Sequence, residues 1–136
     1  MIDVTAPPPL HGLHHVTLTV SDLDVSVGWY ARVLGFTEVT RVRVDGMHKA
    51  LVSRPDLPPI SFVAHGDSAV PDAFDEHRVG LDHVSFAVAD LAELRLWVSV
   101  LDQEGVAHSD VAAGRTGSVV SFRDPDGIAL EFYTLV

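Results

Sequence analysis

The sequence predicts an α+β domain made of two halves of the same design, each with the order β-α-β-β-β. The stretch "LHHVTLTVSDL" at residues 13–23 returns 68 residues later as "LDHVSFAVADL" at residues 81–91. Each copy leads from an alternating strand into an amphipathic helix. The shift is half of the 136-residue length, and a chain of this size forms one domain with a core of its own.

Each copy of the repeat continues into a helix with recognisable ends. The first helix, expected at about residues 23–34, follows Asp22 as its N-cap, and the second, at about residues 91–104, follows Asp90. A glycine comes directly after each helix and ends it.

Three short β-type segments follow each helix. They are expected at about residues 36–44, 47–53 and 59–65 in the first half, and 106–111, 116–123 and 127–134 in the second. The single domain therefore divides into a first module at 11–65, a connection at 66–80 and a second module at 81–136. Residues 1–10, with three consecutive prolines, are expected to form an extended arm.

Composition narrows the classes of function. The chain has no cysteine, which excludes disulfides, thiolate metal sites and cysteine nucleophiles. Its formal charge of −10 argues against nucleic-acid binding and fits either plain solubility or a pocket for cationic ligands. No run approaches the roughly 20 apolar residues of a membrane helix, and the first residues lack a signal-peptide pattern. We therefore expect a cytoplasmic protein that binds neither membranes nor nucleic acids.

Strand parity points to a metal site on the faces turned away from the helices. Alternate side chains of a strand point to opposite faces, so the repeat yields four related inward positions, 15, 61, 83 and 131. Three of them carry His15, His83 and Glu131, and Ser61 fills the fourth. Two imidazoles and a carboxylate suit a divalent first-row metal and leave positions open for water, substrate or oxygen. The alternative is that all three are ordinary surface or hydrogen-bonded residues.

Several neighbours of these residues are candidates for the pocket. Thr17 and Ser85 share the inward faces of their strands, and Tyr133 shares the face of Glu131. Tyr133 is a candidate hydrogen-bond donor to the substrate, and its alternative role is packing at the pocket wall. His14 competes with His15, but strand parity turns it toward the helix side.

Three motifs carry a family resemblance. "HHVTLTVSDLDVSVGWYARVLGF", "GLDHVSFAVADL" and "FRDPDGIALEFY" resemble the vicinal oxygen chelate superfamily, which includes glyoxalases, extradiol dioxygenases, fosfomycin-resistance enzymes and bleomycin-binding proteins. The resemblance implies an open, curved, eight-stranded sheet around a metal site, and a homodimer. It also implies that the family's metal positions fall on His15, His83 and Glu131.

The resemblance leaves several activities open. A set of two histidines and a glutamate is most similar to extradiol dioxygenases, in which iron(II) also binds oxygen, so iron(II) is the favoured metal. Manganese, nickel, cobalt and zinc also suit the ligand types. Ser61 stands where glyoxalases place a glutamate, which argues against the standard mechanism of a glyoxalase-like lyase or isomerase. The third alternative is a metal-free protein that sequesters a drug such as bleomycin.

Overall fold

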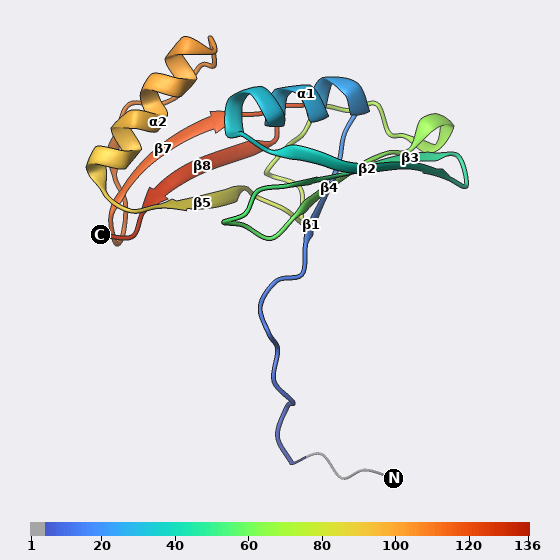
Figure 1. The fold of residues 1–136 in the computed structure, drawn as a ribbon, viewed down its shortest axis with the longest axis horizontal. Helices are drawn as coiled ribbons and strands as arrows, with labels where there is room; N and C mark the ends of the chain where they lie inside the picture. Colours follow the sequence, from blue (N-terminus) through green and yellow to red (C-terminus); the bar gives the residue numbers. More distant parts are fainter. Residues whose placement is uncertain (1–4) are drawn as a thin grey trace.

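A computed structural model describes residues 5–136 of the chain. Residues 1–4 of the expected arm lie outside the described part. The rest of the arm forms no helix or strand, is exposed, and runs away from the folded body (Figure 1). Within residues 5–136, no helix has the length and apolar character needed to cross a membrane.

The two halves have the predicted order of elements. The first module contains β1 (Val16–Thr19), α1 (Leu23–Leu34), β2 (Thr37–Val44), β3 (Met47–Ser53) and β4 (Ile60–Ala64). The second contains β5 (Val84–Val88), α2 (Leu91–Gln103), β6 (Ala112–Ala113), β7 (Ser118–Arg123) and β8 (Ala129–Thr134). A short 3-10 turn, η1 (Gly66–Ser68), lies in the connection between them.

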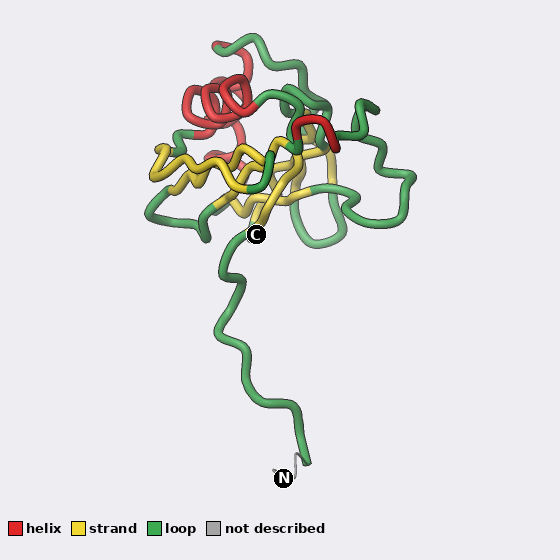
Figure 2. The backbone as a smooth tube through the Cα atoms, turned by 90° about the vertical axis from the view of Figure 1, so that its right-hand side faces the viewer, coloured by secondary structure: helices red, strands yellow, loops and turns green. Residues whose placement is uncertain are grey.

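The strands form two open sheets of four, ordered β1-β4-β3-β2 and β5-β8-β7-β6. In each sheet the first strand pairs in parallel with the last one of its module, and the other pairs are antiparallel. The helices lie on one side of the strands and the arm leaves on the other (Figures 1 and 2). The α+β class with two β-α-β-β-β modules is confirmed, and its eight strands divide into two sheets.

The prediction of a strand at residues 106–111 is wrong in both position and length. His108 makes only an isolated bridge to Phe122, and the strand that follows α2 is the two-residue β6. Ser109 explains the interruption, because its hydroxyl accepts from the backbone N–H of Ser121 at 2.9 Å and donates to the carbonyl of Asp110 at 2.8 Å. Such side-chain bonds compete with the backbone ladder of a sheet.

Two tryptophans occupy matching places in the two modules. Trp29 and Trp97 each lie six residues after the first residue of their helix. Trp97 stacks on Phe132 of its own sheet, with ring centroids 4.7 Å apart. Trp29 instead reaches Phe122 of the other module, at 6.3 Å, so one apolar core runs through both modules.

A buried hydrogen bond also joins the modules. The hydroxyl of Tyr30 on α1 donates to Asp124 Oδ2 at 2.7 Å, in the turn between β7 and β8. Asp124 is 6% exposed and also accepts from the N–H groups of Asp126 and Ile128. Burial raises the pKa of both Tyr30 and Asp124 above their ordinary values.

Candidate metal centre and its cavity

The inward face of the second sheet is set by strand pairing. Along β8, Leu130, Phe132 and Thr134 are buried, whereas Glu131 and Tyr133 on the opposite face are only half-buried. The parallel register of β5 and β8 places Glu131 directly opposite Ser85, and the register of β7 and β8 places Ser121 on its other side. Glu131 is therefore the centre of a row of three inward side chains.

His83 meets Glu131 at this face. It precedes β5 directly, and its Nε2 lies 3.3 Å from Glu131 Oε1. Its Nδ1 lies 2.7 Å from Asp82 Oδ1, and this hydrogen bond is the largest cause that raises the pKa of His83. Nδ1 donates to Asp82, so the other ring nitrogen is directed at the Glu131 carboxylate. A neutral Nε2 and a carboxylate both carry lone pairs, so either a proton or a metal ion must lie between them.

The chemistry of these donors fits a divalent ion. A histidine that ligates a metal usually donates its second ring N–H to a carboxylate, which fixes the tautomer and raises the basicity of the ligand. Asp82 is placed to play this part for His83. The residues present in the second module thus fit the metal that the sequence implies, with one imidazole and one carboxylate as ligands.

His15 lies in the corresponding place of the first module but outside this pair. Its Nδ1 is 2.9 Å from Nδ1 of His14, which stands 68 residues before Asp82 and so takes its place in the repeat. Strand parity turned His14 away from His15, but both residues precede β1, where the alternation of a strand does not yet hold. The hydrogen bond between the Nδ1 atoms leaves Nε2 of His15 available as a ligand atom.

The three predicted ligands do not converge within one chain. Over residues 5–136, the only group of three histidine, aspartate or glutamate residues with ligand atoms within 4.8 Å of one another is Asp75, Glu76 and His77. This group, in which Glu76 is half-buried and the other two residues are exposed, lies in the connection and already has partners, because Asp75 binds His77 and Glu76 binds Arg123. The structure therefore brings together two of the predicted ligands, His83 and Glu131.

The pocket residues of the first module follow the same register. Thr17 pairs with Ser61 in β1 and β4, as Ser85 pairs with Glu131 in β5 and β8. Ser61 accordingly stands at the counterpart of Glu131, so the first module offers a hydroxyl where the second offers a carboxylate.

Tyr133 lies two residues beyond Glu131 on the same face. Its hydroxyl accepts from the backbone N–H of Thr116 at 2.9 Å, and this bond is the largest cause that lowers the pKa of Tyr133. The hydroxyl hydrogen is still free to be donated to another group. Gly114 is required here, because a Cβ at this position would collide with the Tyr133 ring.

A cavity of about 480 Å³ surrounds the pair of His83 and Glu131. Its lining residues are Glu76, Asp82, His83, Ala107, His108, Ser121, Phe122, Arg123, Ala129, Leu130 and Glu131. Sequence reasoning missed Glu76, Asp82, His108 and Arg123 as members of this site. The alternation along β7 could have indicated Arg123, since it lies two residues beyond Ser121 on the same face.

Paired β-α-β-β-β modules, with a histidine and a glutamate together on the inward face of an open sheet, define a class of two-module α+β proteins. The chain belongs to the Glyoxalase/Bleomycin resistance protein/Dioxygenase superfamily, whose family model matches residues 12–132. This confirms the resemblance seen in the three motifs.

Similar proteins within the superfamily differ in activity. A glyoxylase/bleomycin resistance protein/dioxygenase domain from Frankia sp. EAN1pec is 37% identical, with a TM-score of 0.85 over 93% of this chain and 98% of that one. The protein named "Putative ring-cleaving dioxygenase MhqA" from Bacillus subtilis is 28% identical over 90% of this chain. The chain spans only 39% of the length of that protein. Metallothiol transferase FosB from Shouchella clausii is 26% identical over 92% of this chain and 81% of its own. Enzymes are therefore among the chain's relatives, with different reactions.

Proposed function

We propose that this chain is a divalent-metal-dependent enzyme that chelates a small substrate through two neighbouring oxygens and acts as an extradiol-type dioxygenase. The observation that carries the proposal is the 3.3 Å approach of His83 Nε2 to Glu131 Oε1, with Asp82 hydrogen-bonded behind His83. The similarity to MhqA, named as a ring-cleaving dioxygenase, supports the choice of reaction.

The ligand residues would hold the ion through Nε2 of His83, a carboxylate oxygen of Glu131 and an imidazole nitrogen of His15. When bound, the metal would supply Lewis-acid stabilisation of the oxygens of the substrate and, as iron(II), a position for oxygen. Iron(II) is the favoured metal, and manganese, nickel, cobalt and zinc remain alternatives.

The other inward residues would shape and orient the substrate. Tyr133 would donate a hydrogen bond from its hydroxyl, as a catalytic residue, to an oxygen of the substrate. Thr17, Ser61 and Ser85 lie on inward strand faces but are not among the residues that line the cavity of one chain, and they would add small polar groups to the pocket. Each of these roles follows from a place on the inward face of a strand.

The position of His15, the third proposed ligand, indicates that a second copy of the chain takes part in the site. Because His15 does not join His83 and Glu131 within one chain, we propose a homodimer in which His15 of the partner subunit completes each site. Mixing two inactive variants, His15→Ala and Glu131→Ala, tests this arrangement. In a shared site each mixed dimer regains one complete ligand set, and metal binding returns. If each chain held its own full site, mixing would restore nothing.

Metal analysis after anaerobic purification, followed by a ring-cleavage assay with catechol, tests the reaction itself. Stoichiometric iron and a ring-opened product are expected. Zinc or nickel without oxygen uptake would instead favour a glyoxalase-like lyase or isomerase, although Ser61 lacks the carboxylate that glyoxalases place there.

A metal-free drug-binding protein is the second candidate, and two observations favour it. Only two predicted ligands meet within one chain, and the formal charge of −10 suits a cationic drug. Tight bleomycin binding by protein that takes up no metal would establish this candidate and remove the first. We also propose a cytoplasmic location, which the lack of cysteines supports.

A further inference from the structure

Arg123 lies on the same inward face as the proposed metal pair. It pairs with Ala129 in the antiparallel register of β7 and β8, and Glu131 follows Ala129 by two residues. His83 comes one residue before Val84, which pairs with Leu130. It therefore lies beside Ala129, on the side of β8 opposite Arg123. The guanidinium group therefore belongs to the row next to Glu131, at the end of the sheet that His83 occupies.

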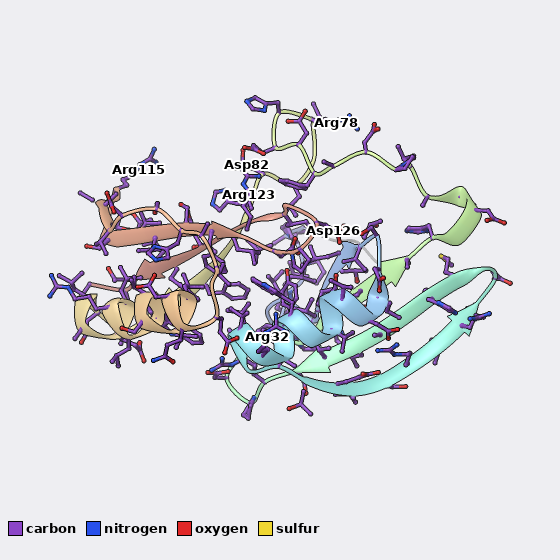
Figure 3. All side chains as sticks on the ribbon, turned by 90° about the horizontal axis from the view of Figure 1, so that it is seen from above. Arg32, Arg78, Asp82, Arg115, Arg123 and Asp126 are labelled. Atoms are coloured by element: carbon purple, nitrogen blue, oxygen red, sulfur yellow. The ribbon has the colours of Figure 1, made fainter. Side chains whose placement is uncertain are left out.

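The cavity contains a single permanent positive charge. Among the described residues that line it, Arg123 is the only arginine or lysine. Figure 3 shows its side chain next to Asp82, under the connection that carries Arg78, whereas Arg115 lies at the far end of the same module. The chain has a formal charge of −10, and the other charged residues that line the cavity are the acidic Glu76, Asp82 and Glu131.

The Arg123 guanidinium already binds a carboxylate through a bidentate pair of hydrogen bonds. Its Nη1 and Nη2 donate to the two carboxylate oxygens of Glu76, at 3.1 and 2.8 Å. Nη1 also donates to the carbonyl of Gly127 at 2.9 Å, which orients the guanidinium. The bond from Arg123 lowers the pKa of Glu76 to about 2. Paired N–H groups of an arginine match the planar geometry of a carboxylate.

The contact with Glu76 can be exchanged without unfolding the connection. The side chains of Arg123 and Glu76 are 49% and 30% exposed, and exposed ion pairs contribute little to stability. The connection has another attachment to the core through the packing of Phe74, and the ion pair between Arg78 and Asp72 holds the segment internally. Glu76 can therefore leave the guanidinium while the rest of the segment stays in place.

We propose that Arg123 anchors a carboxylate group of the substrate, and that Glu76 occupies this anchor until the substrate replaces it. The inference rests on the proposed function and names its substrate class, a small acid that also carries two neighbouring oxygens. Positions two residues apart on a strand lie about 7 Å from each other. This spacing matches one six-membered ring with the oxygen pair at one end and the carboxylate at the other.

The anchor is tested first without any metal, because benzoate has the carboxylate but no second pair of oxygens. Benzoate should shift the NMR signals of the Ala129 and Ser121 amides, and benzyl alcohol should not. Glu76→Gln should tighten benzoate binding by roughly 5- to 10-fold, because it removes the internal competitor and a like charge. Arg123→Gln should abolish the shifts, and Arg123→Lys should weaken binding, since lysine keeps the charge but loses the paired donors.

Arg115→Gln is the matched control, because it removes the same charge from the far end of the module and should leave benzoate binding unchanged. The melting temperature of each variant shows whether the fold is retained. Benzoate binding that is indifferent to Glu76→Gln and Arg123→Gln in folded protein would overturn the anchor.

A second comparison separates this inference from the proposed function. Manganese-loaded protein is titrated with catechol and with 3,4-dihydroxybenzoate, which adds the carboxylate. Binding of 3,4-dihydroxybenzoate is expected to exceed that of catechol by roughly 10-fold or more, and Arg123→Gln should remove the difference. If catechol binds and the carboxylate adds nothing, the anchor is wrong and the metal site stands. If catechol does not bind while benzoate binds through Arg123, the anchor stands and the proposed function is wrong.

Discussion

His83 Nε2 lies 3.3 Å from Glu131 Oε1, although 48 residues separate the two in the sequence. The parallel pairing of β5 with β8 brings them together, because it joins the first and last strands of the second module. A histidine whose other nitrogen is bound by Asp82, together with the facing carboxylate, forms one side of the proposed metal site.

Removal of either partner should therefore abolish metal binding. His83→Ala and Glu131→Gln each leave one protein donor at this sheet. The donors that remain are too few to retain a divalent ion in competition with water. Metal content after dialysis, measured by mass spectrometry, should fall from stoichiometric to trace amounts. His11→Ala, which changes an exposed histidine directly after the arm, is the control. Full metal content in His83→Ala would contradict the site.

The residues that form hydrogen bonds to the two ligand histidines should raise the affinity for metal. Asp82→Asn keeps the shape of Asp82 but removes the charged acceptor whose hydrogen bond raises the pKa of His83, and the metal dissociation constant should rise roughly 10- to 100-fold. His14→Ala should weaken binding in the same range, because His14 bonds to His15 as Asp82 bonds to His83. Asp67→Asn in the exposed turn η1 serves as the control for charge. Equal affinities in all three variants would show that these contacts do not position the ligands.

Tyr133→Phe should lower kcat of ring cleavage by roughly 100-fold, the usual effect of losing one donor to a developing charge. Metal content should stay at the wild-type level, because Tyr133 is not a proposed ligand. Steady-state kinetics with catechol provide the measurement. An unchanged kcat would assign Tyr133 to the pocket wall and to the bond with Thr116.

Tyr30→Phe should lower the free energy of unfolding by about 1–3 kcal/mol, because it removes a donor from a buried carboxylate. Asp124 retains two backbone donors, which keeps the loss within this range. Urea denaturation followed by far-ultraviolet circular dichroism gives the value. Tyr133→Phe, at a more accessible hydroxyl, should have a smaller effect, and the reverse order would show that the bond to Asp124 contributes little to the stability of the fold.

His108 should make stability depend on pH. Its Nδ1 and Nε2 each lie 2.7 Å from an acceptor, the carbonyl of Ser109 and Asp102 Oδ1, so the doubly protonated ring is favoured. These bonds raise the pKa of His108, with that to Ser109 as the largest cause. Stability from a raised histidine pKa is fully present below the unfolded value of about 6.5 and is lost as the pH rises through the folded value.

The matching measurement compares His108→Gln with wild type by urea denaturation on both sides of this range. The variant should be less stable by about 1 kcal/mol or less at acidic pH, and the difference should shrink at alkaline pH. His11→Gln should show no such trend. A difference that grows with pH would mean that His108 is held as the neutral ring.

The sequence by itself determined the modular plan and the faces of the strands. Both helices and five of the six predicted strands after them were found within two residues of their expected bounds. Glycines and aspartates mark these ends locally, and the alternation of apolar residues separates the two faces of β5 and β8. Local rules of this kind are enough to place Glu131 on the inward face and to align Ser61 with it.

Only the tertiary structure decided what these faces meet. The strand expected at 106–111 gave way to side-chain bonds of Ser109 with its neighbours, and Trp29 packs on Phe122 of the other module. The contact of Glu76 with Arg123 joins residues 47 positions apart. No periodicity in the chain encodes such contacts, because they depend on how the two modules and their connection pack in space. For the same reason the sequence aligned His15 with His83 but could not determine whether the two meet within one chain.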